Sequence, residues 1–165
     1  MATQTLLSVE EYLRTSFDGT DVEYVDGELV ERGMPDDPHS ATQVRLIELF
    51  HDLRKHKTIY TRTELRVRVS PKRCRVIDVA VFLEPPSARY PSTPPWVAIE
   101  IVSEDDRMSH IIEKFEDYRR WGVAHIWLID PRLRRLYLYD SSGLREVPAL
   151  AIPEAGIGFG PAELF

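Results

Sequence analysis

Two carboxylates lie inside segments that are otherwise apolar. Asp78 interrupts residues 76–82 (VIDVAVF), and Glu100 interrupts residues 97–102 (VAIEIV). Both segments have the length and composition of strands that are buried on both faces. An unpaired carboxylate is costly to bury, so each of these two acids must find a partner inside the fold.

A divalent cation shared by the two acids would satisfy both of them. Two carboxylates that lie side by side repel each other, and one of them would hold a proton unless a cation lies between them. Oxygen ligands suit Mg²⁺, which often binds through one or two carboxylates and a substrate phosphate. The pattern therefore predicts a site for Mg²⁺ (or Mn²⁺) held by Asp78 and Glu100.

Ordinary salt bridges are the alternative interpretation of the same two acids. Lys114 could neutralise Glu100, and an arginine could neutralise Asp78. The candidate arginines are Arg62, Arg66 and Arg75. The residue pattern alone leaves both interpretations open.

Lys114 is the third candidate functional residue. It lies on a helix expected over residues 107–121, just outside the apolar stripe that contains Ile111 and Tyr118. Its long stem could reach past the edge of the core toward Glu100. An ammonium at that place could orient a nucleophilic water and stabilise negative charge on a phosphate. A surface lysine with a buried stem is the alternative.

Alternating strands and helices must position these residues. Helical periodicity or capping signals predict three helices, and apolar or alternating runs predict the strands. The helices are expected over about 9–15, 38–57 and 107–121, and the strands at 22–25, 28–31, 65–69, 76–83, 96–102, 125–129 and 135–139. This order predicts an α/β fold with a mixed central sheet flanked by helices, preceded by an N-terminal helix and β-hairpin. A parallel crossover should join the strand of Glu100 to the strand of Trp127.

Capping residues and turns predict where these elements begin and end. Asp26-Gly27 is typical of a type I′ hairpin turn, and Gly122 should end the third helix. The predicted N-terminal caps are Ser8 with Glu11 for the first helix, Asp37 with Pro38 for the second, and Asp105 or Asp106 for the third.

The chain of 165 residues fits a single domain. We expect an N-terminal extension at 1–36, a core at 37–140, and a C-terminal strand and tail at 141–165. The sequence has no apolar run long enough to span a membrane, and residues 1–4 lack the features of a signal peptide. A single cysteine, Cys74, is typical of a reducing compartment, so a cytoplasmic location is expected.

The charge of the chain is negative overall and uneven along its length. A formal net charge of −6 argues against a protein that coats nucleic acid by charge alone. Basic residues nevertheless dominate residues 62–75, where Glu64 is the only acid. Such a run is typical either of a solvated hairpin or of a rim that faces phosphate. The candidate nucleic-acid-binding residues are Arg62, Arg66, Arg68 and Arg75.

The ordered set of motifs resembles the Uma2 family, within the PD-(D/E)XK nuclease superfamily. The resemblance covers nearly the whole chain, and it rests on the order of the motifs rather than on any single one. The matching segments are VEYVDGEL at 22–29, PHS at 38–40, VIDVA at 76–80, IEIVS at 99–103, Asp106, EKFEDY at 113–118, Gly122-Val123, WLIDP at 127–131 and AELF at 162–165.

The resemblance implies a restriction endonuclease-like core and assigns roles to the candidate residues. Asp78 would be the acid of the "PD" element and Glu100 the acid of the "(D/E)XK" element, and both would hold the metal. The backbone carbonyl of Ile101 would be a further ligand. Val102 stands where the superfamily has lysine, and Lys114 on the following helix would replace that lysine.

Two more residues match family positions. Glu23 corresponds to a glutamate of the family's N-terminal hairpin and would reach the metal directly or through water; an exposed hairpin carboxylate is the alternative. His39 matches a position at the helix start, where an ordinary polar residue is an equally good interpretation. Ile77 replaces the structural proline of the superfamily.

The resemblance and the residues together predict metal-dependent hydrolysis of a phosphodiester, with DNA as the substrate. The alternative is a nucleic-acid-binding or regulatory module that kept the fold and lost turnover. A protein-interaction role, with a homodimer formed through Trp96, Trp121 or the proline-rich loop at 84–95, is a further alternative.

Overall fold

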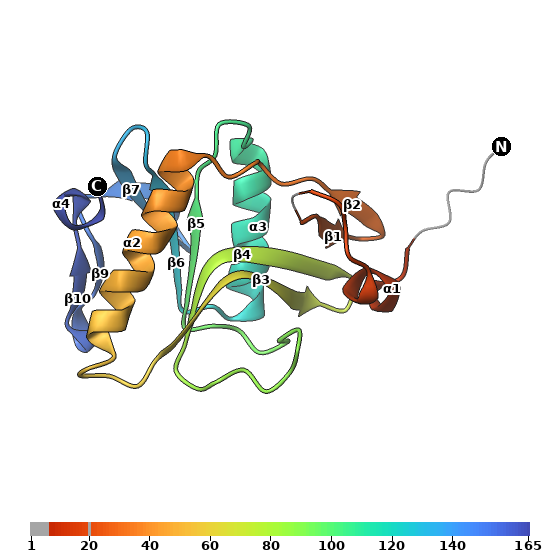
Figure 1. Ribbon diagram of the computed structural model, residues 1–165, viewed down its shortest axis with the longest axis horizontal. Helices are drawn as coiled ribbons and strands as arrows, with labels where there is room; N and C mark the ends of the chain where they lie inside the picture. The colour runs from red at the N-terminus through yellow and green to blue at the C-terminus, as the bar shows by residue number, and fades with distance from the viewer. Residues whose placement is uncertain (1–6, 20) are drawn as a thin grey trace.

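An eight-stranded mixed sheet forms the centre of the molecule in this computed structural model (Figure 1). The structure describes residues 7–19 and 21–165, so residues 1–4, to which the signal-peptide expectation applies, lie outside it. The strand order is β2-β1-β4-β5-β6-β7-β8, and β3 pairs with β4. The strands of this sheet are β1 (Glu23–Val25), β2 (Glu28–Val30), β3 (Tyr60–Ser70), β4 (Arg73–Phe82), β5 (Val97–Ile101), β6 (His125–Asp130), β7 (Arg135–Asp140) and β8 (Gly143–Val147).

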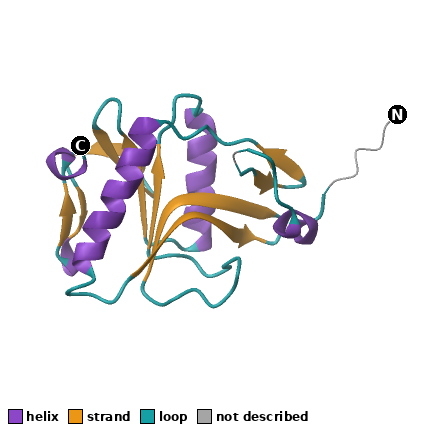
Figure 2. Ribbon diagram, viewed as in Figure 1, coloured by secondary structure: helices purple, strands orange, loops and turns teal. Residues whose placement is uncertain are grey.

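Helices cover both faces of the sheet (Figure 2). The helices are α1 (Val9–Arg14), α2 (Asp37–Leu53), α3 (Met108–Trp121) and α4 (Pro161–Leu164). Leu46 and Phe50 of α2 pack in one apolar cluster, and Phe115 and Tyr118 of α3 pack in the other. The chain is therefore a mixed α/β fold with a central sheet flanked by helices, as the sequence predicts. In the described part of the chain, no helix has the length and apolar character needed to cross a membrane.

The β5–α3–β6 unit gives the sheet its parallel pair. Glu100 of β5 lies beside Leu128 of β6 in parallel register. The other neighbouring strands of the main sheet pair in antiparallel fashion over the described residues. Gly122 ends α3 in the left-handed conformation, at φ +103°, which a residue with a Cβ rarely adopts. The parallel neighbours expected for the strands of Glu100 and Trp127 are thus confirmed.

Strand β4 changes neighbours along its length. Strand β3 pairs with one edge of β4. The other edge pairs with β1 at Arg73 and Cys74 and with β5 from Val79 to Val81. Between these two contacts, at residues 75–78, no ladder pair joins β4 to β1 or β5 in the described chain. We call residues 75–78 the β4 gap, and Asp78 lies at its end.

The structure confirms one predicted N-cap and corrects two others. Ser8 and Glu11 form the capping box of α1. The N-cap of α2 is Asp36, not Asp37, because the Asp36 carboxylate accepts a hydrogen bond from the His39 N–H. No side chain caps α3, whose N-cap residue is Arg107.

The expected cap of α3 has a different partner. Asp106 instead accepts a hydrogen bond from the backbone N–H of Ser103 at 2.7 Å and so closes the turn that leaves β5. The Asp26-Gly27 turn is confirmed, since both residues have positive φ angles, 51° and 100°.

The C-terminal residues contain more structure than the strand and tail that we expected. After β8, the strands β9 (Leu150–Ile152) and β10 (Ile157–Phe159) form a separate two-stranded sheet, with a 3₁₀ turn between them. Their inward residues and Leu164 pack in the apolar cluster on the α2 side. Each strand has only three residues, which is too short for a periodic pattern to predict.

Arg66 attaches α1 to the sheet. Its guanidinium pairs with Asp21 at 2.5 Å, donates to the backbone carbonyls of Tyr12 and Thr15, and lies over the Tyr12 ring. Its side chain is 10% exposed, so these contacts are shielded from water. Arg66 is therefore a structural residue and not part of a phosphate-facing rim.

Replacing Arg66 should weaken the attachment of α1. We expect Arg66→Met to lower the free energy of unfolding by about 2 kcal/mol, because buried charge-assisted hydrogen bonds are lost. Urea denaturation measures this, with Arg62→Met as the matched control, since the Arg62 side chain is exposed and, among the described residues, donates one hydrogen bond, to the neighbouring Thr61 carbonyl. Equal effects of the two substitutions would contradict this assignment.

Candidate active site

The β4 gap brings together side chains from β1, β4, β5 and α3. Buried backbone groups that have no ladder partner must bind elsewhere. The N–H of Val76 donates to Glu23 at 3.0 Å, and its carbonyl accepts from the Lys114 ammonium at 2.7 Å. Glu23 and Lys114 thus replace the missing neighbouring strand and are themselves fixed in the gap.

Asp78 and Glu100 lie next to each other on one face of the sheet. Val79 pairs with Ile99 and Ala80 with Ala98, so continuing the register places Asp78 opposite Glu100. Residues opposite each other in an antiparallel pair share a face. Both acids also line the same cleft, and the charge of Asp78 acts on Glu100. The two predicted metal ligands therefore do not point to opposite faces.

Both oxygens of Asp78 have donors. Oδ1 accepts from Arg32 at 2.5 Å, whereas Oδ2 accepts from the Ile101 N–H at 2.8 Å and lies 3.3 Å from His39 Nε2. Burial alone would raise the pKa of Asp78, but the bond to His39 and the charges of Lys114 and Arg32 lower it to about 2. Asp78 is therefore a carboxylate at every physiological pH.

Glu100 has a raised pKa, whereas the pKa values of Asp78 and Glu23 are lowered. Burial is the main cause that raises its pKa to about 8, and the charge of Asp78 adds to it. The Lys114 ammonium at 2.6 Å opposes this shift, and the Tyr118 hydroxyl donates to the other oxygen at 2.7 Å. Two adjacent acids with separated pKa values are characteristic of functional sites.

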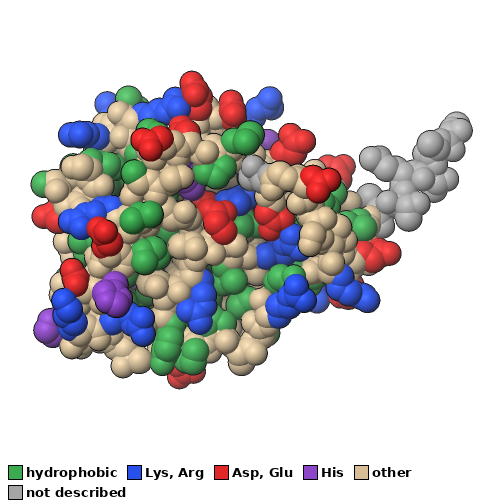
Figure 3. All heavy atoms as spheres, in the orientation of Figure 1, with side chains coloured by type: hydrophobic (Ala, Val, Ile, Leu, Met, Phe, Trp, Pro, Cys, Tyr) green, Lys and Arg blue, Asp and Glu red, His purple; other side chains and the backbone are tan. Residues whose placement is uncertain are grey.

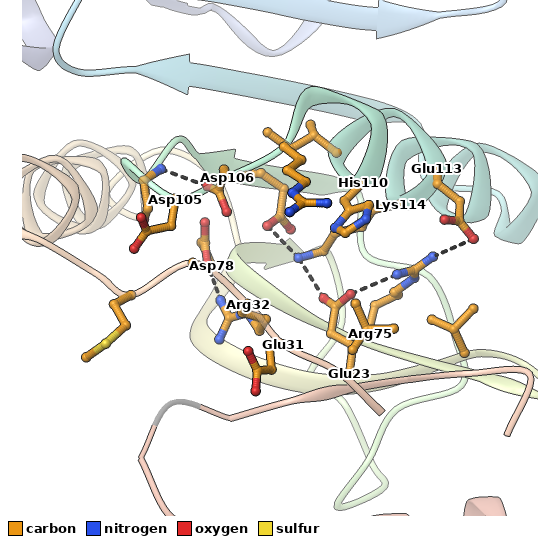
Figure 4. Close-up of a pocket in the computed structure, with 18 of the residues that line it drawn as sticks. Glu23, Glu31, Arg32, Arg75, Asp78, Asp105, Asp106, His110, Glu113 and Lys114 are labelled. Carbon is orange, nitrogen blue, oxygen red and sulfur yellow. Dashed lines mark hydrogen bonds and ion pairs between the residues drawn. The ribbon is translucent and has the colours of Figure 1, made fainter. Parts of the chain in front are cut away.

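Lys114 is buried, not at the edge of the core as the helical periodicity suggests. Lys114 is 8% exposed. Its ammonium contacts Glu23 at 2.8 Å and also contacts Glu100 and the Val76 carbonyl. Burial alone would lower the pKa of Lys114, but Glu100 and Glu23 raise it. The ammonium therefore stays charged beside both acids (Figure 4).

Glu23 belongs to the site and is not an exposed hairpin carboxylate. It is 4% exposed, and Arg75 donates to it at 2.8 Å. Arg75 also pairs with Asp117 at 2.6 Å and is itself 2% exposed. Arg75 therefore cannot form part of an exposed nucleic-acid-binding rim, and that expectation is corrected. The charge run did not reveal this because it carries no information about which side of a strand faces the core.

The salt-bridge alternative is right for one acid and names the wrong partners for the other. Lys114 does pair with Glu100. Asp78 pairs with Arg32, which the sequence interpretation did not consider. Arg62 and Arg68 are at least partly exposed, and Arg68 contacts Glu10 at 3.4 Å.

Three further residues of the site were missed. Arg32, Glu64 and Gln43 all contact each other or Asp78: Arg32 pairs with Glu64 at 2.7 Å, and Gln43 donates to Glu64 and to the Asp78 carbonyl, both at 2.9 Å. Glu64 had a visible signal, because it is the single acid in a basic strand. Arg32 and Gln43 lie in segments without a distinguishing pattern.

The donor set fits a hard divalent cation. Asp78 and Glu100 supply adjacent carboxylates, and one ligand atom each from His39, Glu64 and Asp78 lie within 4.8 Å of one another. The Arg32 guanidinium already lies against Asp78 as a cation of the chain's own. The described residues thus offer the oxygen ligands that a hard divalent cation prefers, and one of them already pairs with a positive charge.

A cleft of about 1120 Å³ opens over these residues. Its lining has nine acidic and five basic side chains, so its field favours cations. The cleft runs between the β1–β2 hairpin, the segment before α2 and the N-terminal half of α3 (Figure 4). On the face shown in Figure 3, basic and acidic side chains are interspersed, without a continuous basic surface.

A family model described as "Uma2: Putative restriction endonuclease" matches residues 9–157. The chain belongs to the Uma2 family. The solved structures similar to this Uma2 chain include "a putative nuclease belonging to DUF820" from Anabaena variabilis ATCC 29413, at 22% identity and a TM-score of 0.83. That match covers 96% of this chain and 97% of the other, and it confirms the predicted fold class. No curated protein matches the chain.

The raised pKa of Glu100 predicts a pH-dependent stability of this Uma2 chain. A carboxyl whose folded pKa lies above its unfolded value stabilises the fold at low pH, and this contribution is lost as the pH rises from about 4.5 to about 8. Relative to Glu100→Gln, the wild type should therefore lose on the order of 3 kcal/mol between pH 5.5 and 8.5.

Urea denaturation in the presence of a chelator at both pH values measures this loss. Glu84→Gln is the control, because Glu84 is exposed in the loop after β4, and it should follow the wild type. Parallel pH profiles of wild type and Glu100→Gln would contradict the raised pKa.

Proposed function

We propose that the chain is a divalent-metal-dependent endonuclease that hydrolyses phosphodiester bonds in DNA. The family supports a nuclease; the metal, the substrate and the residue roles are our inference. The observation that carries it is the meeting of Asp78, Glu100 and Lys114 at the β4 gap, inside a cleft that is open to a substrate.

In this proposal, Asp78 and Glu100 hold Mg²⁺ (or Mn²⁺), and the backbone carbonyl of Ile101 completes the protein ligands. Ile101 is adjacent to Asp78, because its N–H already binds the Asp78 carboxylate. When bound, the metal supplies a Lewis acid for the phosphate and lowers the pKa of water. A bound cation would favour the ionised form of Glu100, so the proton of this carboxyl would pass to solvent.

Lys114 orients the nucleophilic water and stabilises negative charge that develops on the phosphate. Its three N–H groups are already engaged by Glu23, Glu100 and the Val76 carbonyl, so its bond to Glu100 has to be released before it can orient a water. Glu23 positions Lys114 through the 2.8 Å contact and can reach the metal through water. His39 lies against Asp78 and holds that carboxylate in place.

Binding of the polyanionic substrate depends on more than the cleft. The acidic lining repels phosphate until a divalent cation neutralises part of its charge. Arg62 and Arg68 remain the proposed contacts for nucleic acid outside the cleft, and a second copy of the chain, as a homodimer, would add binding surface. Cys74 is a buried free cysteine, which fits the cytoplasmic location that we propose.

A catalytically silent binding or regulatory module is the second candidate. The observation that favours it is the pairing of Asp78 with Arg32, which leaves the acid neutralised without any metal. The two candidates differ in whether Asp78 is needed for cleavage of a nucleic acid.

Cleavage assays test the proposed activity. We expect nicking or linearisation of supercoiled plasmid in Mg²⁺ or Mn²⁺, abolished by a chelator and reduced about a thousandfold by Asp78→Asn, because metal sites supply several kcal/mol to the transition state. Lys114→Gln should also reduce cleavage, with folding checked by circular dichroism.

Asp105→Asn is the matched control. Asp105 lines the same cleft but is exposed, so this substitution should leave cleavage close to that of the wild type. Cleavage that survives Asp78→Asn and the chelator would contradict the proposed mechanism. A folded wild type that cleaves neither DNA nor RNA would favour the silent module.

A further inference from the structure

We propose that Arg32 determines the metal affinity of the site, because its guanidinium occupies Asp78 and must leave when a divalent ion binds. This inference rests on the proposed function, since it concerns the same carboxylate. It adds a residue that lies outside the acids and the lysine of the nuclease motif.

Arg32 binds Oδ1, the Asp78 oxygen that would otherwise be available to a cation. Oδ2 of Asp78 is already bound by the Ile101 N–H and His39, whereas Arg32, at 2.5 Å, is the sole partner of Oδ1 among the residues that the structure describes. The Arg32 side chain is 11% exposed. A guanidinium and a divalent ion on one buried carboxylate oxygen would repel each other strongly at low dielectric. The two cations therefore compete for Oδ1.

Glu64 fixes the second end of the guanidinium. It accepts from Arg32 Nη1 at 2.7 Å, and its backbone has φ +48°, a left-handed conformation that is uncommon for a residue with a side chain. In the β3–β4 register, Thr63 pairs with Val79 and Leu65 with Ile77, which leaves Glu64 opposite Asp78 without a ladder pair.

Gln43 fills the place of that missing pair. Its amide donates to the Asp78 carbonyl and to Glu64 at the same time. The pairing of Glu64 with Asp78 in the ladder is thus replaced by the Gln43 side chain, and the Glu64 carboxylate binds Arg32. This arrangement gives Arg32 a carboxylate to keep when it releases Asp78.

The segment that carries Arg32 is tightly seated. We call residues 31–36 the strap, because they connect β2 to α2 beside the cleft (Figure 1). A Cβ added at Gly33 would lie 2.5 Å from Asp106 Oδ1 and 3.1 Å from Ser103 Cβ, so a side chain there would displace Asp106. At the other end, Asp36 caps α2 and pairs with Arg132 at 2.7 Å. The strap therefore aims Arg32 at Asp78 (Figure 4).

Calorimetric titration of the chelator-treated protein with Mn²⁺ tests this role. We expect Arg32→Met to bind Mn²⁺ about tenfold more tightly or better, because the ion no longer has to displace a charge-assisted hydrogen bond. The direction is diagnostic, since a purely structural role of Arg32 would weaken binding when the residue is lost.

Arg73→Met is the matched control. Arg73 lines the same cleft and carries the same charge, but its partners are Asp26, Glu113 and Asp117 rather than Asp78. Its loss should change the affinity less than about threefold, through long-range charge alone. An equal gain in both variants, or weaker binding by Arg32→Met, would overturn the role of Arg32.

A measurement on the intact chain covers the case in which Arg32→Met does not fold. With ¹⁵N-labelled arginine, Mg²⁺ should shift the side-chain signal of Arg32, assigned with Arg32→Lys, far more than that of Arg73. An Arg32 signal that stays unchanged at saturating Mg²⁺ would overturn the inference. If the wild type and the variants all fail to bind Mn²⁺ and Mg²⁺, the metal chemistry of the proposed function fails as well, whereas binding without an effect of Arg32 refutes the competition alone.

Discussion

The architecture of the site depends on one constraint, which is that buried backbone groups in the β4 gap need hydrogen-bond partners. Strand β4 pairs with β1 at Arg73 and Cys74 and joins β5 at Val79, so among the described residues the segment between them lacks a strand neighbour on that side. Side chains fill the vacancy: Glu23 and Lys114 bind the backbone of Val76. The residues that complete the sheet are therefore those to which we assign roles in the proposed chemistry, and hydrogen bonds fix their conformations before any ligand arrives.

Charge compensation follows from this arrangement. Every buried acid of the site has a cationic partner: Asp78 has Arg32, Glu23 has Arg75 and Lys114, and Glu100 has Lys114. Glu100 is the one with a raised pKa, because burial and then the charge of Asp78 raise it more than Lys114 lowers it. In our proposal, an incoming divalent ion would change this balance by ionising Glu100 and by taking the place of Arg32. Without a metal, the charges of the site are balanced by the chain's own cations.

Local patterns in the sequence predicted most of the fold and the centre of the site. Asp78 and Glu100 were found because acids inside apolar strands are conspicuous, and Lys114 because its helix follows Glu100 closely. Arg32 could not be found in this way, because it reaches Asp78 through a segment without regular structure and across 46 positions.

Other misses also arise from long-range contacts. The burial of Lys114 depends on its three partners in β1, β4 and β5, not on helical periodicity. Arg66 and Arg75 belong to a basic run, but Asp21, Glu23 and Asp117, distant in sequence, turn them into structural residues. A run of like charges carries no information about such partners.

The most direct test of the central claim is the anomalous density of a crystal soaked in Mn²⁺. The account predicts one peak between the carboxylates of Asp78 and Glu100, with the Arg32 guanidinium moved off Asp78. A fully soaked crystal without a peak at this pair of acids, and with Arg32 still bound to Asp78, would contradict a shared divalent cation.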